Sequence, residues 1–193
     1  MTEHVAGTEP YAWPFDGRLV GPHVALVLAG WDARWSGRAV VDDGVTERVA
    51  ALAAAVAARG GMVLVLAHGG SEPLAPTDDD HHVVAVHGID GFGGSQLDLM
   101  LRTTRRTHLL VAGNGIEGPV HSTLRSANDR GYECLLVTDA CTALTTDLAE
   151  ASAKTVTMSG GIFGAIGTTG AVLDALAGPP SVPDPVPAQE ALT

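Results

Sequence analysis

The sequence predicts an α/β protein with an open, mostly parallel six-stranded sheet and helices on both faces. Three observations lead to this prediction. Short apolar runs rich in β-branched residues recur along the chain, they are nearly continuous in hydrophobicity instead of alternating, and stretches with helical periodicity separate them. Continuous apolar runs are typical of strands buried on both faces of a parallel sheet, and the helices between them supply the crossovers.

The strands are predicted where aliphatic residues dominate for several positions. These runs are Val24–Ala29, Met62–Ala67, Val83–Val86, Leu109–Ala112, Cys134–Val137 and, more weakly, Thr155–Met158. In open α/β sheets, ligands bind at the carboxyl ends of the strands. We therefore expect a functional site in the loops after residues 29, 67, 86 and 112.

The helices are predicted from apolar stripes and from the glycines that follow them. The clearest is Val45–Arg59, which is rich in alanine, carries Val49 and Leu52 on one stripe, and is followed by Gly60 and Gly61. The other predicted helices are Gln96–Arg102, Val120–Arg130, Asp147–Ala153 and Thr169–Leu176.

Length and composition favour one domain with two appendages. The chain has 193 residues, of which 46% are hydrophobic and 17% charged, so it can bury a substantial core. We place the domain at 22–178, an N-terminal arm at 1–21, and a flexible tail at 179–193 that holds five prolines within nine positions.

Charge and cysteine content exclude several classes of partner. The net charge of −11 repels phosphate backbones and anionic lipids, so neither nucleic acid nor a membrane is expected as a partner. No apolar run reaches 18 residues, the first residues do not resemble a signal peptide, and two cysteines are too few for a disulfide scaffold. These features predict a reduced, cytoplasmic protein.

Several separated motifs resemble one family. The segment Leu109–Cys141 (LLVAGNGIEGPVHSTLRSANDRGYECLLVTDAC) resembles the nucleophile strand, turn and helix of the isochorismatase-like cysteine hydrolases. FGGSQLDLMLR at 92–102, SGGIFG at 159–164 and the threonines at 168–169 are similar to other family segments, in the family's order. PYAWPFDG at 10–17 and SANDRGYECLL resemble the branch that includes biuret hydrolase. The resemblance spans about residues 10–177.

The family's catalytic residues are replaced in this chain. The resemblance implies an Asp–Lys–Cys triad whose positions are occupied here by Gly30, Val86 and Pro119. None of these side chains can transfer a proton or attack a carbonyl carbon, and proline also lacks the backbone N–H that contributes to the family's oxyanion hole. Proline suits the first turn of the helix that follows, because its N–H is not needed there. The resemblance therefore implies a family fold without catalytic residues.

Polar residues near the expected site have two interpretations each. Asp32 could turn toward the pocket, but a solvated loop carboxylate is favoured because nothing in the sequence fixes its direction. Glu117 and His121 are four residues apart and could face each other to activate a water molecule. The favoured interpretation is a carboxylate that complements a helix dipole and an unrelated surface histidine.

A metal site is the less favoured interpretation of the histidines. His68 ends the second strand, and with 78–82 (DDDHH) and His87 it could suggest metal ligands, but no fixed ligand spacing supports this. No metal and no cofactor are predicted. Asn114 and Gly115 lie in a turn that resembles a phosphate loop but lacks the Lys-Ser/Thr that follows one. Members of the family that the chain resembles usually have a longer excursion between the second and third strands, so the resemblance implies that the short 69–82 connection leaves the pocket shallower or partly unroofed.

Two function classes remain at this point. The leading hypothesis is a pseudoenzyme that binds a small molecule or serves as an assembly partner. As the resemblance implies, it would be a homo-oligomer (dimer or tetramer) or pair with an active paralogue. The alternative is a hydrolase acting on a small amide, carbamoyl or isochorismate-like substrate. Its relocated site would use Asp32, His68, Glu117 and His121 around an activated water. Cys134 and Cys141 do not replace the missing thiol, because the first lies within a strand and no base is predicted beside the second.

Overall fold

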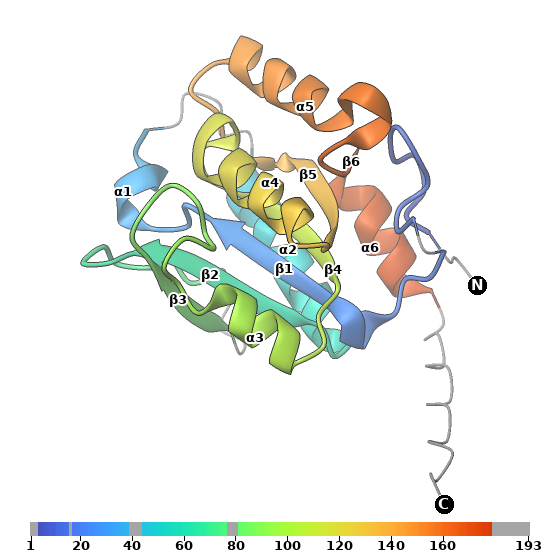
Figure 1. Cartoon of the computed structure of the whole chain (residues 1–193), viewed down its shortest axis with the longest axis horizontal. Helices are drawn as coiled ribbons and strands as arrows, with labels where there is room; N and C mark the ends of the chain where they lie inside the picture. The colour runs from blue at the N-terminus through green and yellow to red at the C-terminus, as the bar shows by residue number, and fades with distance from the viewer. Residues whose placement is uncertain (1–3, 16, 39–43, 77–80, 179–193) are drawn as a thin grey trace, which may run out of the picture.

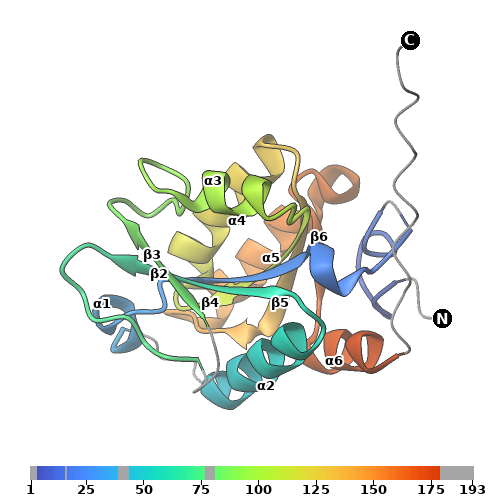
Figure 2. The same cartoon turned by 90° about the horizontal axis from the view of Figure 1, so that it is seen from below.

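The fold is a six-stranded, all-parallel open sheet covered by helices on both faces (Figures 1 and 2). The computed structural model describes residues 4–15, 17–38, 44–76 and 81–178. The strand order is β3-β2-β1-β4-β5-β6. The strands are β1 Val24–Ala29, β2 Met62–His68, β3 His82–Val86, β4 His108–Gly113, β5 Glu133–Cys141 and β6 Ala165–Gly167. The predicted fold class is confirmed.

The helices form two layers, one on each face of the sheet. Figure 2 shows α2 (Val45–Ala58) and α6 (Thr169–Ala177) below the sheet, and α3 (Leu97–Thr103), α4 (His121–Asp129) and α5 (Thr146–Gly161) above it. The short helix α1 (Ala33–Ser36) lies beyond the carboxyl end of β1. A 3₁₀ turn, η1 (Gly21–His23), precedes β1, and a π-helical turn, η2 (Ile116–Val120), precedes α4.

Helix α2 forms where the alanine-rich stripe was predicted. Its apolar stripe, which includes Val49 and Leu52, is buried, and Gly60 follows the helix with a φ of +71°. Glycine adopts this left-handed conformation without the steric penalty of a Cβ atom, so the chain can turn directly into β2.

The predicted sixth strand, Thr155–Met158, is wrong. Residues 155–157 lie in the helical part of α5, and Met158, with φ −57° and ψ 154°, begins a kink in this element. The first turn of α5 is capped by the Thr145 hydroxyl, which accepts a hydrogen bond from the Leu148 N–H at 3.3 Å. Local β-propensity is weaker than tertiary context, and here Val156 is fully buried as part of the helix's inner face. The sixth strand is instead the three-residue β6, which is too short to give a clear sequence signal.

The N-terminal arm lies along the free edge of β6. The Glu9 N–H donates to the Ile166 carbonyl at 3.1 Å, and the Ile166 N–H donates to the Glu9 carbonyl at 2.8 Å. Trp13, which belongs to the arm, is fully buried, and its ring centroid lies 5.8 Å from that of His108. The arm thereby pairs an edge that would otherwise expose unsatisfied backbone groups. The tail predicted at 179–193 lies outside the described residues.

The connection from β2 to β3 stays close to the carboxyl end of β1. The Ala33 N–H donates to the Glu72 carbonyl, and the Leu74 N–H donates to the Trp31 carbonyl, each at 3.0 Å. Within the described part of this connection there is no helix. None of the helices in the described ranges is both long and apolar enough to span a membrane.

Candidate functional site

The carboxyl ends of β1, β4 and β5 meet at a network centred on Asn114. The Asn114 side chain donates to the Gly30 carbonyl and accepts from the Thr142 hydroxyl, each at 3.1 Å. The Thr142 hydroxyl in turn accepts from the Gly115 N–H at 3.1 Å. Asn114 and Thr142 are both buried. Because these hydrogen-bonding groups are used within the protein, Asn114 holds the three strand ends together instead of facing a ligand.

The space between Gly30 and Pro119 is filled. Gly30 has a φ of +61°, and a Cβ atom placed there would lie 2.7 Å from the Asn114 carbonyl oxygen and 2.8 Å from Pro119 Cγ. The Trp35 indole closes the third side, with Cγ 3.3 Å from the same point. Contacts below 3.0 Å are not tolerated without movement, so no side chain fits at position 30 in this arrangement.

Pro119 was predicted in the first turn of the helix that follows, but it lies in the π-helical turn that precedes α4. The turn is closed by the Val120 N–H, which donates to the Gly115 carbonyl at 3.4 Å. Gly115 enables this geometry with a φ of +74°. A π turn is rare and is found mostly as a single turn, often at functional sites. Here it places the Pro119 ring against Gly30.

Asp32 is buried, so the favoured prediction of a solvated loop carboxylate is wrong. The residue is fully buried and caps α1, because its Oδ1 accepts from the N–H groups of Arg34 (2.9 Å) and Trp35 (3.2 Å). Its Oδ2 accepts from the His68 N–H at 2.8 Å and lies 3.0 Å from His68 Nδ1. The Arg34 and Trp35 donors are local, whereas the tertiary fold supplies the His68 groups from β2, which sequence reasoning could not place.

Asp32 and His68 form a buried polar pair at the site. His68 is also buried. Since the carboxylate accepts from Nδ1–H, the pair favours the tautomer in which Nε2 carries the lone pair. The arrangement orients one imidazole nitrogen as a potential proton acceptor.

His87 and Val86 do not extend this polar pair. Val86 is buried at the end of β3, paired in register with His68. His87 is exposed, and its ring lies beside Gly69 and Gly94. The predicted pocket candidate His87 is therefore at the surface of the sheet edge.

Glu117 and His121 do not form the pair that was considered. Glu117 Oε1 accepts from the Leu144 N–H at 3.3 Å, whereas Glu117 Oε2 and His121 Nε2 are both buried without a hydrogen-bond partner. The His121 ring packs against Phe163, 6.3 Å between centroids. Burial and the nearby Arg125 lower the pKa of His121. This histidine is half-buried, and therefore not the surface residue that was favoured.

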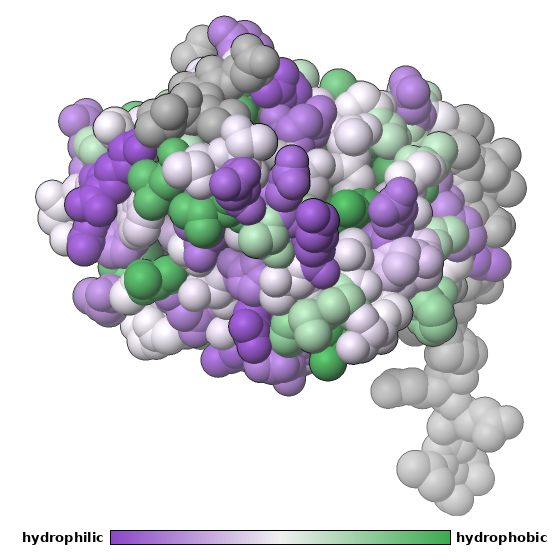
Figure 3. All heavy atoms as spheres, turned by 90° about the horizontal axis from the view of Figure 1, so that it is seen from above, coloured by the Kyte–Doolittle hydropathy of each residue, from purple (hydrophilic) through white to green (hydrophobic). Residues whose placement is uncertain are grey.

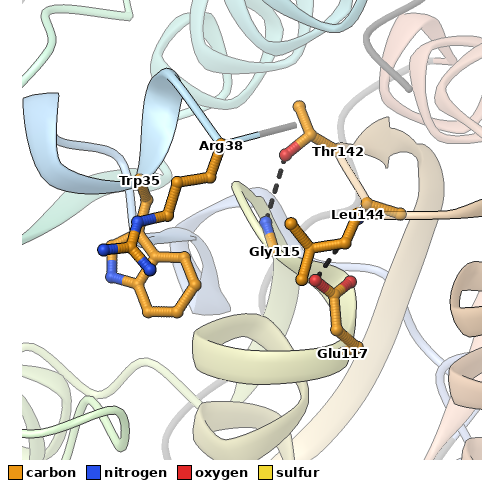
Figure 4. A pocket seen from close by; sticks show the side chains of 7 residues that line it. Trp35, Arg38, Gly115, Glu117, Thr142 and Leu144 are labelled. Atoms are coloured by element: carbon orange, nitrogen blue, oxygen red, sulfur yellow. Dashed lines mark hydrogen bonds between the residues drawn. The ribbon is translucent and has the colours of Figure 1, made fainter. Parts of the chain in front are cut away.

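A shallow hollow opens beside these residues (Figure 4). Its volume is about 170 Å³, part of which is open solvent. Figure 4 shows Trp35 and Arg38 on one side and Glu117 and Leu144 on the other. The enclosed part of the hollow is much smaller, about 10 Å³, which is room for about one water molecule. It is lined by Trp35, Arg38, Gly115, Glu117, Thr142, Ala143 and Leu144.

Sequence reasoning missed Trp35, Arg38 and Thr142. The Arg38 guanidinium lies 5.4 Å from the Trp35 ring centroid, so the two side chains form one wall. The available signal was the aromatic residue placed shortly after the first strand, in the sequence WDARW. Thr142 gave no signal, because the strand it follows was predicted to end earlier, at Val137.

Neither cysteine is available as a nucleophile. Both are free and buried. Cys141 is the last residue of β5, and burial raises its pKa to about 12, with Asp139 and Glu117 adding to the effect. Burial also raises the pKa of Cys134 strongly. Neutral buried thiols are poor nucleophiles.

Across the described ranges, no three His, Cys, Asp or Glu side chains gather in a geometry that could hold a metal ion. The aspartates at 78–80, which the sequence analysis considered as ligands, lie outside these ranges. His81 and His82 were considered as ligands with them; His82 is the first residue of the edge strand β3, and His81 precedes it. The strand ends thus carry three features: the filled space bounded by Gly30, Pro119 and Trp35 (called the mouth below), the Asp32–His68 pair and one small hollow.

Comparisons with known proteins match this architecture. A family model described as an isochorismatase domain matches residues 25–169, which is more than half of the chain. The fold is similar to a cysteine hydrolase from Pseudomonas syringae pv. phaseolicola (TM-score 0.73, 18% identity, covering 82% of this chain and 94% of that one). It is also similar to an isochorismatase family protein from Desulfovibrio vulgaris (TM-score 0.70, 22% identity, 80% and 98% covered). A nicotinamidase from Staphylococcus aureus matches with a TM-score of 0.64 and 15% identity, covering 75% of this chain and 98% of that one.

Proposed function

The chain belongs to the isochorismatase domain family, and from this premise we propose that it has the family fold without cysteine-hydrolase activity. In this proposal it acts as a small-molecule binder or as an assembly partner. The observation that carries the proposal is the filled space between Gly30, Pro119 and Trp35.

The chemistry at the triad positions supports the proposal. The resemblance assigns the acid, the ammonium and the thiol to Gly30, Val86 and Pro119, none of which can exchange a proton or attack a carbonyl. Both cysteines are buried elsewhere with raised pKa values, so no other thiol replaces the missing nucleophile.

Steric exclusion supports it independently. A substrate carbonyl must approach the nucleophile's position to within about 3–3.5 Å. At that position Pro119 Cγ lies 2.8 Å from where a Cβ atom of residue 30 would be, and the Trp35 indole lies within 3.5 Å of where Cβ atoms of residues 115 and 118 would be. The mouth would therefore have to open before any substrate could reach it.

The test is a turnover assay of the purified full chain. Biuret, nicotinamide and isochorismate are the substrates, chosen because the sequence resembles the biuret hydrolase branch and because a nicotinamidase shares the fold. We expect no hydrolysis above the uncatalysed rate, with a nicotinamidase as the positive control. Turnover of roughly 1 s⁻¹ or faster, which is typical of enzymes, would contradict the proposal.

One observation favours a second candidate function. The Asp32–His68 pair leaves His68 Nε2 as a possible base for an activated water, as a relocated hydrolase site would need. Glu117 and His121 do not join this pair, so the test falls on His68. If an activity on a small amide is found, His68→Gln should abolish it while the protein stays folded. Unchanged activity in that variant would exclude this candidate.

Assembly is the remaining part of the proposal. Leu148, Met158 and Ile162 belong to or follow α5 and are 40–50% exposed. Figure 3, which views the molecule from above, shows hydrophobic patches between hydrophilic residues. These patches support contact with a second copy, in a dimer or tetramer, or with an active paralogue. Light scattering coupled to gel filtration would measure the mass, and a monomer at micromolar concentration that also fails to bind a paralogue would contradict this part. A cytoplasmic location is proposed from the two free thiols.

A further inference from the structure

The sheet ends on one side at a strand whose outer edge is open. Figure 1 shows β3 at one margin of the sheet and β6 at the other. The N-terminal arm pairs with β6 through Glu9 and Ile166, whereas no segment of the described ranges pairs with the outer side of β3. This part of the chain therefore presents one open sheet edge, at His82–Val86.

The backbone groups that point outward from this edge belong to Val83 and Ala85. The Val86 carbonyl accepts from the Gly69 N–H at 3.0 Å, so Val86 turns its backbone groups toward β2. Alternate residues of a strand direct these groups to opposite edges. The N–H and C=O groups of Val83 and Ala85 therefore point away from β2, and within the described ranges they have no hydrogen-bond partner.

The side chains of these two residues are exposed and apolar. Val83 is 50% exposed and Ala85 is exposed, whereas Val84 and Val86, on the opposite face of the strand, are buried. Parallel sheets normally have both faces covered by the crossover helices. The described part of the β2–β3 connection has no helix, which leaves the face with Val83 and Ala85 bare.

The edge lacks the features that usually prevent a strand from pairing with another chain. Such features include charged side chains, proline and a β-bulge. β3 reads HVVAV, with no proline, lysine, arginine or carboxylate, and its register with β2 runs without a bulge from His82 to Val86. Copies of a chain with a net charge of −11 repel each other over most of their surface. An uncharged strand is a favourable place for two such copies to meet.

A second copy of the chain fits this edge because the pairing can be symmetric. In an antiparallel pair with a two-fold axis at Val84, Val83 of each copy lies opposite Ala85 of the other. Each Val83–Ala85 pair then exchanges two N–H···O=C bonds, which uses the outward groups of both strands. A valine beside an alanine also places a large side chain next to a small one. Because the described part of each chain has one open edge, the contact closes as a dimer and does not propagate.

From this geometry we propose that β3 pairs antiparallel with β3 of a second copy and joins two six-stranded sheets into one. The inference rests on the assembly role proposed above and names the surface that carries it. This surface is separate from the apolar residues of α5, and it does not depend on whether hydrolysis is lost. A five-residue strand is only about 17 Å long, so the dimer should be weak and concentration-dependent.

The first test measures the mass of the full chain by sedimentation velocity at about 1 to 300 µM, where a weak dimer forms. We expect the wild type to shift from monomer to dimer over this range. Val83→Lys places two ammonium groups on one face of the pair, diagonally across the two-fold axis, and should weaken dimerisation at least about tenfold. Leu148→Lys makes the same change in charge on α5, at a residue that is 40% exposed, and should leave the β3 dimer intact.

The second test fixes the register of the pair by cysteine cross-linking. Directly opposite residues have Cα atoms about 5.5 Å apart, within the range of a disulfide, whereas diagonal neighbours at about 7–8 Å lie beyond it. A mixture of Val83→Cys and Ala85→Cys should therefore form a disulfide-linked dimer under mild oxidation. Each variant alone should cross-link at least about tenfold more slowly. The native cysteines are buried and should not react.

Three results would overturn the inference. They are a wild type that remains a monomer at about 300 µM, equal dimerisation of Val83→Lys and the wild type, or cross-linking of either single variant as fast as the mixture. If circular dichroism shows that Val83→Lys does not fold, the cross-linking rates decide. An assembly that is lost in Leu148→Lys but kept in Val83→Lys would place the contact on α5. That outcome would refute the β3 pairing while the proposed assembly role stands.

Discussion

Replacing Gly30 by alanine tests whether the mouth of the strand ends is filled. The substitution combines two costs. An L-residue at a φ of +61° costs about 1–2 kcal/mol in the left-handed region. A new Cβ atom at 2.7 Å from the Asn114 carbonyl oxygen and 2.8 Å from Pro119 Cγ adds an overpacking cost of about 1–3 kcal/mol. We expect a total loss of about 2–5 kcal/mol in the free energy of unfolding.

Gly131→Ala is the matched control for this prediction. Gly131 has a φ of +85°, and a Cβ atom there would meet nothing within 4 Å. It should therefore lose only the conformational part, about 1–2 kcal/mol. Urea unfolding followed by tryptophan fluorescence gives both values, and each kcal/mol lowers Tm by roughly 2–4 °C for a chain of this size. Equal losses in the two variants would refute the claim that the mouth is filled.

A double variant extends the same reasoning. Pro119→Ala removes the Cγ atom that lies 2.8 Å from the new Cβ, but the Asn114 carbonyl oxygen remains at 2.7 Å. Gly30→Ala should therefore cost less in the Pro119→Ala background, with only partial rescue. Additive costs would show that Pro119 and position 30 do not compete for space. For the same reason, restoring an acid at position 30 requires a change at Pro119 first.

Three further predictions concern the buried ionisable groups. Asp32→Ala should lower the free energy of unfolding in urea by about 2–5 kcal/mol, because it removes the α1 cap and leaves the His68 N–H unsatisfied. The control Asp174→Ala, at an exposed position, should change it by no more than about 0.5 kcal/mol. Similar values for the two variants would contradict the buried pair. Because the pKa of His121 is lowered in the folded protein, the unfolded chain binds more protons than the folded one just below pH 6.5. The free energy of unfolding should therefore fall on acidification through that range, and His121→Phe should weaken this dependence. An unchanged pH profile in the variant would contradict the prediction. The pKa of Cys141 is raised to about 12 in the folded protein, so stability should fall as pH rises above about 9, where only the unfolded thiol ionises. Both buried thiols should also resist a thiol reagent at pH 8 until denaturant is added. Rapid labelling of the native protein would contradict their burial.

The strand and helix patterns were sufficient for the fold class, because continuous apolar runs and the stripe of α2 report burial directly. They failed at Thr155–Met158, where β-branched residues lie in a helix that packs through Val156. A short-range pattern cannot report which neighbour a segment packs against.

The candidate site was only partly predictable, for a related reason. The sequence by itself determined that Gly30, Val86 and Pro119 carry no reactive group, since chemistry is a property of the residue type. Only the tertiary structure decided that Asp32 is buried against His68 and that Trp35 closes the mouth. Those contacts join segments distant along the chain, and their energies depend on distance and burial that exist only after the strands are assembled.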